Sequence, residues 1–297
     1  MTIGQTIHFG KPSLSGSDMD RVFASVPGNL LGPGASMPSA LTIDLRNVQF
    51  VDPGGMTCLW AAVHALRARR QDVTLLMPRS ADVLSYMDRM GFFRRMVEEG
   101  VACSSRSFTE WSHSRNSPAL LELTRIQADD EISVIISTIL DRMQQILESQ
   151  LGYSTRVISD LATALTEACR NVVDHSSGTG VAAVQTYVRS GTREVRISVS
   201  DCGDGIRSTL VEQYPELARA GDAEAIVMAL RKRRSRFRDH DRGLGLYRIK
   251  QIVREHSGVL HIRSGEASIA VSASPAARSV SYFPGTHLHI ILPAGDG

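Results

Sequence analysis

The sequence has 297 residues, of which 42% are hydrophobic, and its 33 basic and 31 acidic residues leave a formal net charge of +2. A chain of this length can bury two cores, and its length predicts about two domains. The nearly balanced charge lacks the basic field of a nucleic-acid-binding protein, so we do not expect nucleic acid as a partner.

Several classes of protein are excluded by what the sequence lacks. No apolar run approaches the roughly 18 residues of a membrane helix, and the start MTIGQTIHFG lacks the basic and apolar pattern of a secretory signal. The four cysteines are scattered without a CxxC pair, which argues against a zinc site or a disulfide framework. We therefore expect a cytoplasmic protein that does not contact a membrane.

The first hundred residues alternate between strand and helix patterns. LTIDLRNVQFVD predicts a strand and its exit loop, MTCLWAAVHALRARR a helix, DVTLLMP a second strand, and SADVLSYMDRMGFFRRM a second helix. This order implies parallel strands in an α/β domain over residues 1–101. The serine-rich stretch 102–119 predicts a linker. A second domain then covers residues 120–297.

The second domain opens with a predicted strand, LLELTRI, and a long helix, EISVIISTILDRMQQILESQL. A further amphipathic helix ends in TEACRNVVDHS, where Glu167, Asn171 and His175 are four residues apart and share one face. An asparagine oxygen suits Mg²⁺, and a carboxylate one turn earlier can deprotonate a nucleophile that attacks a terminal phosphate. Glu167 is thus a candidate base and Asn171 a candidate metal ligand. An ordinary solvated helix face is the alternative.

A second motif, DCGDGI, follows the alternating apolar and polar run at 195–200, which predicts a strand of a half-buried sheet. Asp201 then lies at a strand end. Its carboxylate can accept a hydrogen bond from the amino group of adenine, while Gly203 and Gly205 let the backbone approach a flat base. A simple tight turn is the alternative.

A third motif, RGLGL, opens the helical pattern YRIKQIVREHSG. Backbone amides and the positive end of a helix dipole can hold phosphate oxygens there. The preceding segment at 231–242 has seven basic residues in RKRRSRFRDHDR, and an arginine such as Arg242 can pair with two phosphate oxygens. A solvated basic face is the alternative. The segment 264–284, rich in serine and alanine, predicts an exposed hairpin or loop without chemistry.

In this order the three motifs resemble the GHKL superfamily of ATP-binding domains, which includes anti-sigma-factor serine kinases and sensor histidine kinases. The resemblance covers about 150–293. It implies an α/β sandwich, in which helices cover one face of a mixed sheet and the nucleotide lies between helices and sheet under a lid, here 207–242. It also implies ATP and Mg²⁺ as cofactors. Gly285 and Thr286 match the GT pair that lies near the adenine in that family.

The resemblance also implies a role for each matching residue. Glu167 is the catalytic base and Asn171 the metal ligand. The implied ATP-binding residues are Asn171, Asp201, Gly203, Gly205, Ile206, Arg242, Gly243, Leu244, Gly245, Leu246 and Thr286.

The N-terminal domain resembles the STAS fold of anti-sigma-factor antagonists, which partner GHKL serine kinases. The resemblance depends on Asp44, Phe50, Asp52, Gly55 and the helix that follows. Antagonists carry a phosphorylatable serine in this loop, whereas this sequence has Gly54, which has no hydroxyl to accept a phosphoryl group. We therefore expect a docking or regulatory role for this domain.

Three functions remain open from the sequence. One is a serine/threonine protein kinase that acts on a protein partner, such as a STAS antagonist or a sigma-factor-like regulator. The second is an ATP-gated interaction switch that hydrolyses slowly or only binds ATP. The third is a scaffold without catalysis. A sensor histidine kinase is not expected, because the helix pattern at 131–151 contains no histidine. A homodimer is an open alternative.

Overall fold

The protein is described from a computed structural model. It covers residues 4–8, 12–16, 18, 30–35, 38, 40–103, 121–126, 137, 148, 153–175, 179–189, 191–231, 245–272 and 276–293.

The N-terminal domain is built on a parallel sheet, as its sequence predicts. The strands are β1 (Gln5–His8), β3 (Leu41–Asp44), β5 (Val73–Leu76) and β6 (Ala102–Cys103), in the order β1-β3-β5-β6. β2 (Ser13–Leu14) and β4 (Phe50–Val51) form a separate parallel pair. Because β6 pairs with β5, residues 102–103 belong to this sheet and not to a linker. The rest of the predicted linker, up to residue 120, lies outside the described residues.

Three helices complete the N-terminal domain: α2 (Pro53–Ala68), α3 (Ala81–Arg89) and α4 (Phe92–Glu98). α2 starts with proline in its first turn, and the Asp52 side chain caps it by accepting from the Gly55 amide at 2.9 Å. The single helix expected over 80–96 is wrong. Gly91 takes a left-handed φ of 70° and separates α3 from α4.

The C-terminal domain contains an antiparallel sheet of β7 (Leu121–Ile126), β8 (Gly180–Arg189), β9 (Thr192–Asp201), β10 (Val259–Val271) and β11 (Ala276–Pro293). Their order is β10-β11-β9-β8-β7. The α/β class is confirmed, but the mixed sheet is not observed, since every described pair is antiparallel. Two hairpins, β8–β9 and β10–β11, impose that direction. The segment expected as an exposed hairpin forms parts of β10 and β11, with Ser264 and Phe283 buried.

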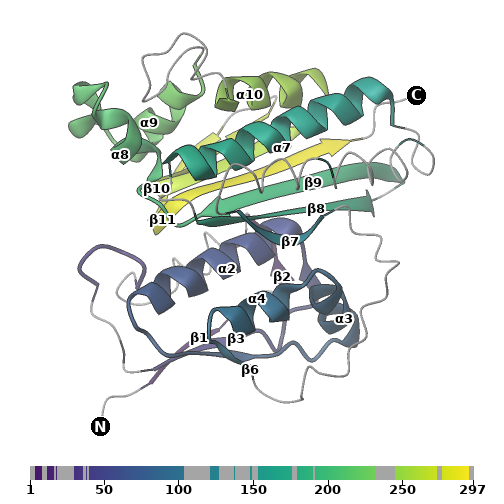
Figure 1. Ribbon diagram of the computed structural model, residues 1–297, viewed down its shortest axis with the longest axis vertical. Helices are drawn as coiled ribbons and strands as arrows, with labels where there is room; N and C mark the ends of the chain where they lie inside the picture. The colour runs from purple at the N-terminus through teal and green to yellow at the C-terminus, as the bar shows by residue number, and fades with distance from the viewer. Residues whose placement is uncertain are drawn as a thin grey trace.

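Helices cover one face of this sheet (Figure 1). They are α7 (Thr155–His175), α8 (Gly205–Val211), the short 3-10 helix η3 (Pro215–Ala218), α9 (Asp222–Ala229) and α10 (Gly245–Glu255). The long helix predicted over 131–151 lies outside the described residues, apart from Ser137 and Glu148. Within the described part of the chain, no helix has the length and apolar character needed to cross a membrane.

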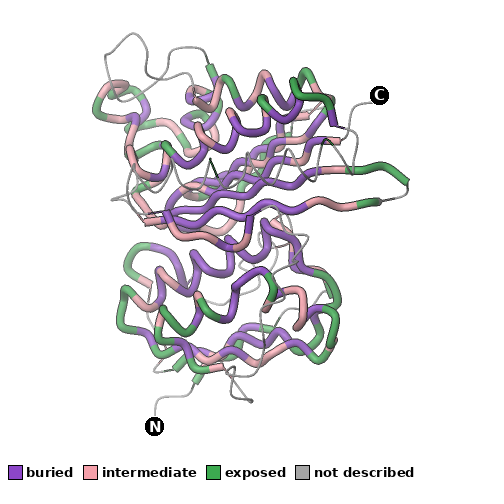
Figure 2. The backbone as a smooth tube through the Cα atoms, turned by 45° about the vertical axis from the view of Figure 1, so that its right-hand side comes forward, coloured by how far each residue is buried: buried purple, intermediate pink, exposed green. Residues whose placement is uncertain are grey.

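The N-terminal domain covers the opposite face of the same sheet (Figure 1), where α2 packs across β8, β9 and β11. The apolar residues of β9 face the helices, as predicted, but the alternating polar residues are not exposed. Arg196, Ser198 and Ser200 are 6%, 1% and 0% exposed. The expected half-buried sheet is therefore buried on both faces, although the tip of the β8–β9 hairpin near Gly191 is exposed (Figure 2).

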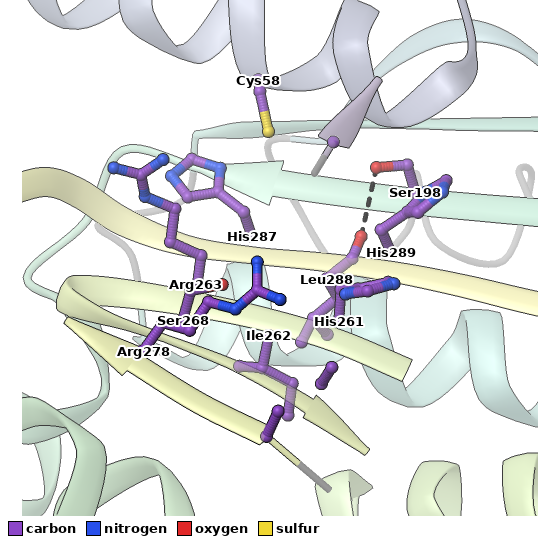
Figure 3. A pocket seen from close by; sticks show the side chains of 13 residues that line it. Cys58, Ser198, His261, Ile262, Arg263, Ser268, Arg278, His287, Leu288 and His289 are labelled. Carbon is purple, nitrogen blue, oxygen red and sulfur yellow. Dashed lines mark hydrogen bonds between the residues drawn. The ribbon is translucent and has the colours of Figure 1, made fainter. Parts of the chain in front are cut away.

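The interface between the domains encloses a small cavity, which Cys58 of α2 and residues of β9, β10 and β11 line (Figure 3). Apolar packing surrounds it. Leu123, Val181 and Phe283 of the C-terminal sheet join the core of the N-terminal domain.

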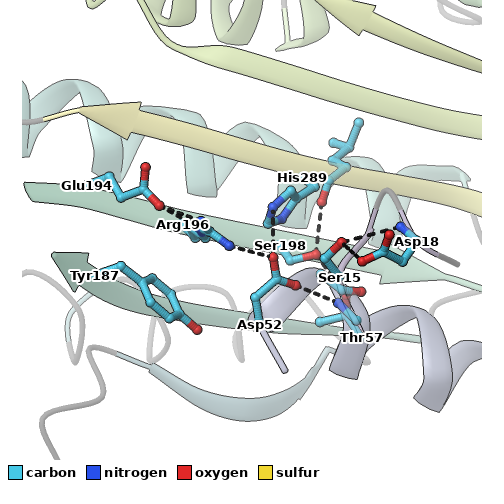
Figure 4. A network of polar contacts seen from close by, with 12 residues as sticks. Ser15, Asp18, Asp52, Thr57, Tyr187, Glu194, Arg196, Ser198 and His289 are labelled. Carbon is cyan, nitrogen blue, oxygen red and sulfur yellow. Dashed lines mark hydrogen bonds and ion pairs between the residues drawn. The ribbon is translucent and has the colours of Figure 1, made fainter. Parts of the chain in front are cut away.

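A buried polar network also joins the two domains (Figure 4). Arg196 donates to the Asp52 carboxylate at 2.8 Å, and both side chains are almost fully buried. The Thr57 and Ser198 hydroxyls lie 2.7 Å apart, and the Tyr86 and Tyr187 hydroxyls lie 2.8 Å apart. These pairs explain why polar side chains of β9 can be buried.

Candidate functional site

Glu167 and Asn171 lie one turn apart on α7, as the sequence predicts. α7 buries an apolar stripe against the sheet, which leaves this face toward α10. The Glu167 side chain is 15% exposed, and its Oε1 atom accepts from Arg248 Nη1 of α10 at 2.9 Å. The ion pair fixes the direction of the carboxylate. The side chain of His175, the third residue of the predicted face, lies outside the described residues.

The first residue of α10 lies against this pair. A Cβ atom built on Gly245 would lie 3.1 Å from Glu167 Oε2 and 3.5 Å from Asn171 Oδ1. Glycine thus keeps space open where the helix amides begin. Asn171 Nδ2 is buried and has no hydrogen-bond partner among the described residues. A polar ligand in this space would satisfy that amide, so the site fits a phosphate-bearing cofactor.

Asp201 lies at the end of β9 and is 6% exposed. Burial raises the pKa of its carboxyl to about 7, although the backbone N–H groups of Gly203 and Thr286 donate to it and oppose the shift. The bond from Gly203 N is 2.8 Å long. Thr286, predicted from the GT pair, is therefore next to Asp201. An acceptor in this low-polarity position suits the amino group of adenine.

Two glycines with positive φ shape the backbone around Asp201. Gly205 and Gly285 both have a φ of 77°, and a side chain on Gly285 would collide with the Asp201 carbonyl oxygen. Ser264 connects the two segments that contain these glycines. Its hydroxyl oxygen accepts from the Ile206 amide at 2.8 Å, and the hydroxyl donates to the Gly285 carbonyl at 3.1 Å. Ser264 could not be predicted from local sequence patterns, because its role depends on the pairing of β10 with β11.

The remaining predicted residues divide into two groups. Leu246 lies in the first turn of α10 and packs partly buried against the core. Arg242, Gly243 and Leu244 lie outside the described residues, as does the basic segment 232–241 of the predicted lid. The described part of that lid, 207–231, folds into the rest of α8, η3 and α9, and α9 packs against β10.

A cavity of about 400 Å³ lies beside Glu167 along α7. Hydroxyl and charged side chains line much of it. They include Thr155, Ser159, Thr163, Thr166, Arg170 and Arg248. No three histidine, cysteine or carboxylate side chains gather as metal ligands within the described ranges. A Mg²⁺ ion at Asn171 would therefore need phosphate oxygens and water as further ligands, which is its usual coordination beside nucleotides.

Comparison with known families agrees with this geometry. Residues 134–272 match the model of the histidine kinase-like ATPase domain. The match includes α7, the end of β9 and the start of α10, and it leaves the N-terminal α/β region unassigned. No curated protein matches the chain. Residues 134–272 thus form a histidine kinase-like, ATP-binding domain.

Proposed function

We propose that the protein is an ATP-dependent serine/threonine protein kinase that acts on a protein partner, similar to anti-sigma-factor kinases. The observation that carries the proposal is the position of Glu167, beside both the Asn171 amide and the glycine start of α10. A carboxylate there is placed next to the proposed phosphate site and can accept a proton from an attacking hydroxyl.

Each residue of the site has a distinct role in this proposal. Asp201 and Thr286 bind the adenine end, and the glycine start of α10 receives the phosphates. Asn171 holds Mg²⁺, which neutralises phosphate charge when bound. Glu167 accepts the proton of the partner's hydroxyl. Arg248, by its 2.9 Å bond to Glu167, orients the carboxylate.

The substrate is proposed to be a separate protein, not the chain's own N-terminal domain. Gly54 offers no hydroxyl, and a Cβ atom there would lie 2.8 Å from His289 Nδ1 and 2.9 Å from Gly16 N. Gly54 lies in the first turn of α2, and α2 lies on the sheet face opposite to α7 (Figure 1). A STAS-type antagonist with a serine at the equivalent loop position is the partner class that we propose, and the N-terminal domain has a docking or regulatory role.

A second function, an ATP-gated switch without phosphoryl transfer, is favoured by one observation. The Glu167 carboxylate is engaged by Arg248. Because Arg248 lies on α10, nucleotide binding beside this ion pair could instead reorganise α10 and the lid and change which partner docks.

Transfer of labelled phosphate from ATP distinguishes the two functions. The full chain would be incubated with serine-containing STAS proteins, beside Glu167→Gln and the matched exposed control Glu266→Gln. The kinase predicts labelled partner, a loss of at least about 100-fold in Glu167→Gln and no loss in the control. Saturable ATP binding without transfer to any partner, but with ATP-dependent partner docking, would support the switch instead.

A further inference from the structure

The cavity between the domains lies on the sheet face that α2 covers (Figure 3), whereas α7 of the nucleotide site covers the other face (Figure 1). Its volume is about 80 Å³. Since a cavity of about 10–15 Å³ can hold one water, this one can hold several waters or one small polyatomic ion. Gly16 and Cys58 contribute its N-terminal wall, and β9, β10 and β11 contribute the rest.

The charged lining of the cavity is basic. Arg263 and Arg278 line it, and none of the described lining residues carries a carboxylate. The Arg263 guanidinium is held over the Phe283 ring at 4.8 Å and donates to the Ser281 carbonyl at 2.7 Å. Arg278 lies on the exposed part of β11. A small anion in the cavity would thus lie beside two guanidinium groups.

Acidic groups near the cavity are already paired. Asp52 lies 3.5 Å from His289 Nε2, but its carboxylate accepts a 2.8 Å bond from Arg196, which also pairs with Glu194. Asp52 in addition caps α2. The carboxylates of Asp52 and Glu194 are thus paired with Arg196, and the charged side chains that line the cavity are arginines.

Three histidines line the cavity, and His287 offers it a hydrogen-bond acceptor. His287 Nε2 lies 2.9 Å from the Pro284 carbonyl, which can only accept, so Nε2 carries the proton and Nδ1 has a lone pair. Burial, with the Arg263 charge beside it, lowers the pKa of His287 to about 3, and burial beside His289 lowers the pKa of His261 to about 4. Both rings are neutral at pH 7. The Nδ1 atoms of His287 and His289 are buried with no hydrogen-bond partner within the described chain, and these two residues are only 4% and 7% exposed.

We propose that this cavity binds a small oxyanion that retains a hydroxyl group, namely hydrogen phosphate as the free ion. Its charged oxygens accept from Arg263 and Arg278, and its hydroxyl donates to His287 Nδ1. The cavity volume of about 80 Å³ favours the free ion over a larger phosphate ester. A metal ion is not favoured, because the described residues form no cluster of three metal-ligating side chains.

Binding would also strengthen contact between the domains. The walls come from both domains, so an ion that binds only the docked arrangement stabilises it by mass action. The site is independent of the proposed kinase activity, since none of its lining residues belongs to the nucleotide site.

Calorimetric titration of the full chain with inorganic phosphate at pH 7 tests the proposal. We expect saturable binding that Arg278→Gln weakens about tenfold, while Arg79→Gln, an exposed arginine of the N-terminal domain, leaves it unchanged. Because Arg278 is exposed, its variant should fold. Sulfate, which has no proton at pH 7, should bind at least about tenfold more weakly, since it leaves His287 Nδ1 without a donor.

The nucleotide site could also receive phosphate, so Asn171→Ala is titrated in parallel and should retain the phosphate binding that Arg278→Gln weakens. Phosphate binding that is lost in Asn171→Ala but kept in Arg278→Gln would overturn the proposal. Equal affinity for sulfate and phosphate, or no binding by the unmodified chain, would overturn it as well.

Discussion

Replacement of Asp201 by asparagine is expected to stabilise the nucleotide-free protein at neutral pH while it weakens ATP binding. Burial raises the pKa of this carboxyl from 3.8 to about 7, a difference of about 3 pKa units. At pH values between these two pKa values, Asp201 keeps its proton in the folded protein but has released it in the unfolded chain. The free energy of unfolding therefore falls as the pH rises from about 4 to 7, and then stays level.

The size of this stability difference follows from the pKa difference of Asp201 between the folded and unfolded states. At about 1.4 kcal/mol per pKa unit, ionisation of Asp201 costs the folded protein up to about 4 kcal/mol above pH 7. Asparagine has the shape of the protonated carboxyl and is neutral at every pH, and its oxygen can still accept from the Gly203 amide. The free energy of unfolding of the variant should thus equal that of the unmodified protein near pH 4 and exceed it near pH 8.

Chemical denaturation at pH 4.5, 6 and 8, without nucleotide, measures this difference. Glu266→Gln, which removes an exposed carboxylate of β10, is the control and should change little. The same Asp201→Asn protein should bind ATP at least about tenfold more weakly, since the charged acceptor for the adenine amino group is lost. A stability difference that does not grow with pH would refute the reasoning about burial.

Three further substitutions test other parts of the molecule. Gly54→Ser should lower the free energy of unfolding by at least about 2 kcal/mol, since its Cβ would lie 2.8 Å from His289 Nδ1. Gly4→Ala is the control in the same denaturation experiment. A serine variant of full stability would contradict the close docking of α2 on β11. Arg196→Met should lower the free energy of unfolding by about 3 kcal/mol, because it leaves the Asp52 carboxylate buried without its partner. Adding Asp52→Asn should restore part of that loss. Strictly additive losses in the double-mutant cycle would show that the pair is not coupled. Glu167→Gln should keep ATP affinity within about twofold but lower phosphate transfer at least about 100-fold. Loss of ATP binding, measured by calorimetry, would show that this carboxylate binds the nucleotide and would contradict its role as the base.

Local patterns in the sequence predicted much of the C-terminal fold. The alternating run at 195–200 predicted β9 and placed Asp201 at its end, which the structure confirms. The four-residue spacing placed Glu167 and Asn171 on one face of α7, and the glycine-rich motif predicted the start of α10. These features depend on short-range geometry, which periodicity reflects directly. The roles of these residues in binding ATP stay predictions.

Long-range contacts could not be predicted in the same way. Arg196 was expected on a solvated face, but it is buried because Asp52, far away in the sequence, supplies its partner. Ser264 was left without a role because its hydrogen bonds to Ile206 and Gly285 require three separate segments to meet. The helix break at Gly91 depends on a local backbone choice that the apolar spacing did not reveal.

Calorimetric titration with ATP, with and without Mg²⁺, is the decisive test of the nucleotide site formed by Asn171 and Asp201. The unmodified protein would be compared with Asn171→Ala and Asp201→Asn. We expect saturable binding that Mg²⁺ strengthens and that both substitutions weaken, with the Mg²⁺ dependence lost in Asn171→Ala. Binding of ATP that neither substitution changes, or no binding by the unmodified protein, would contradict the proposed site.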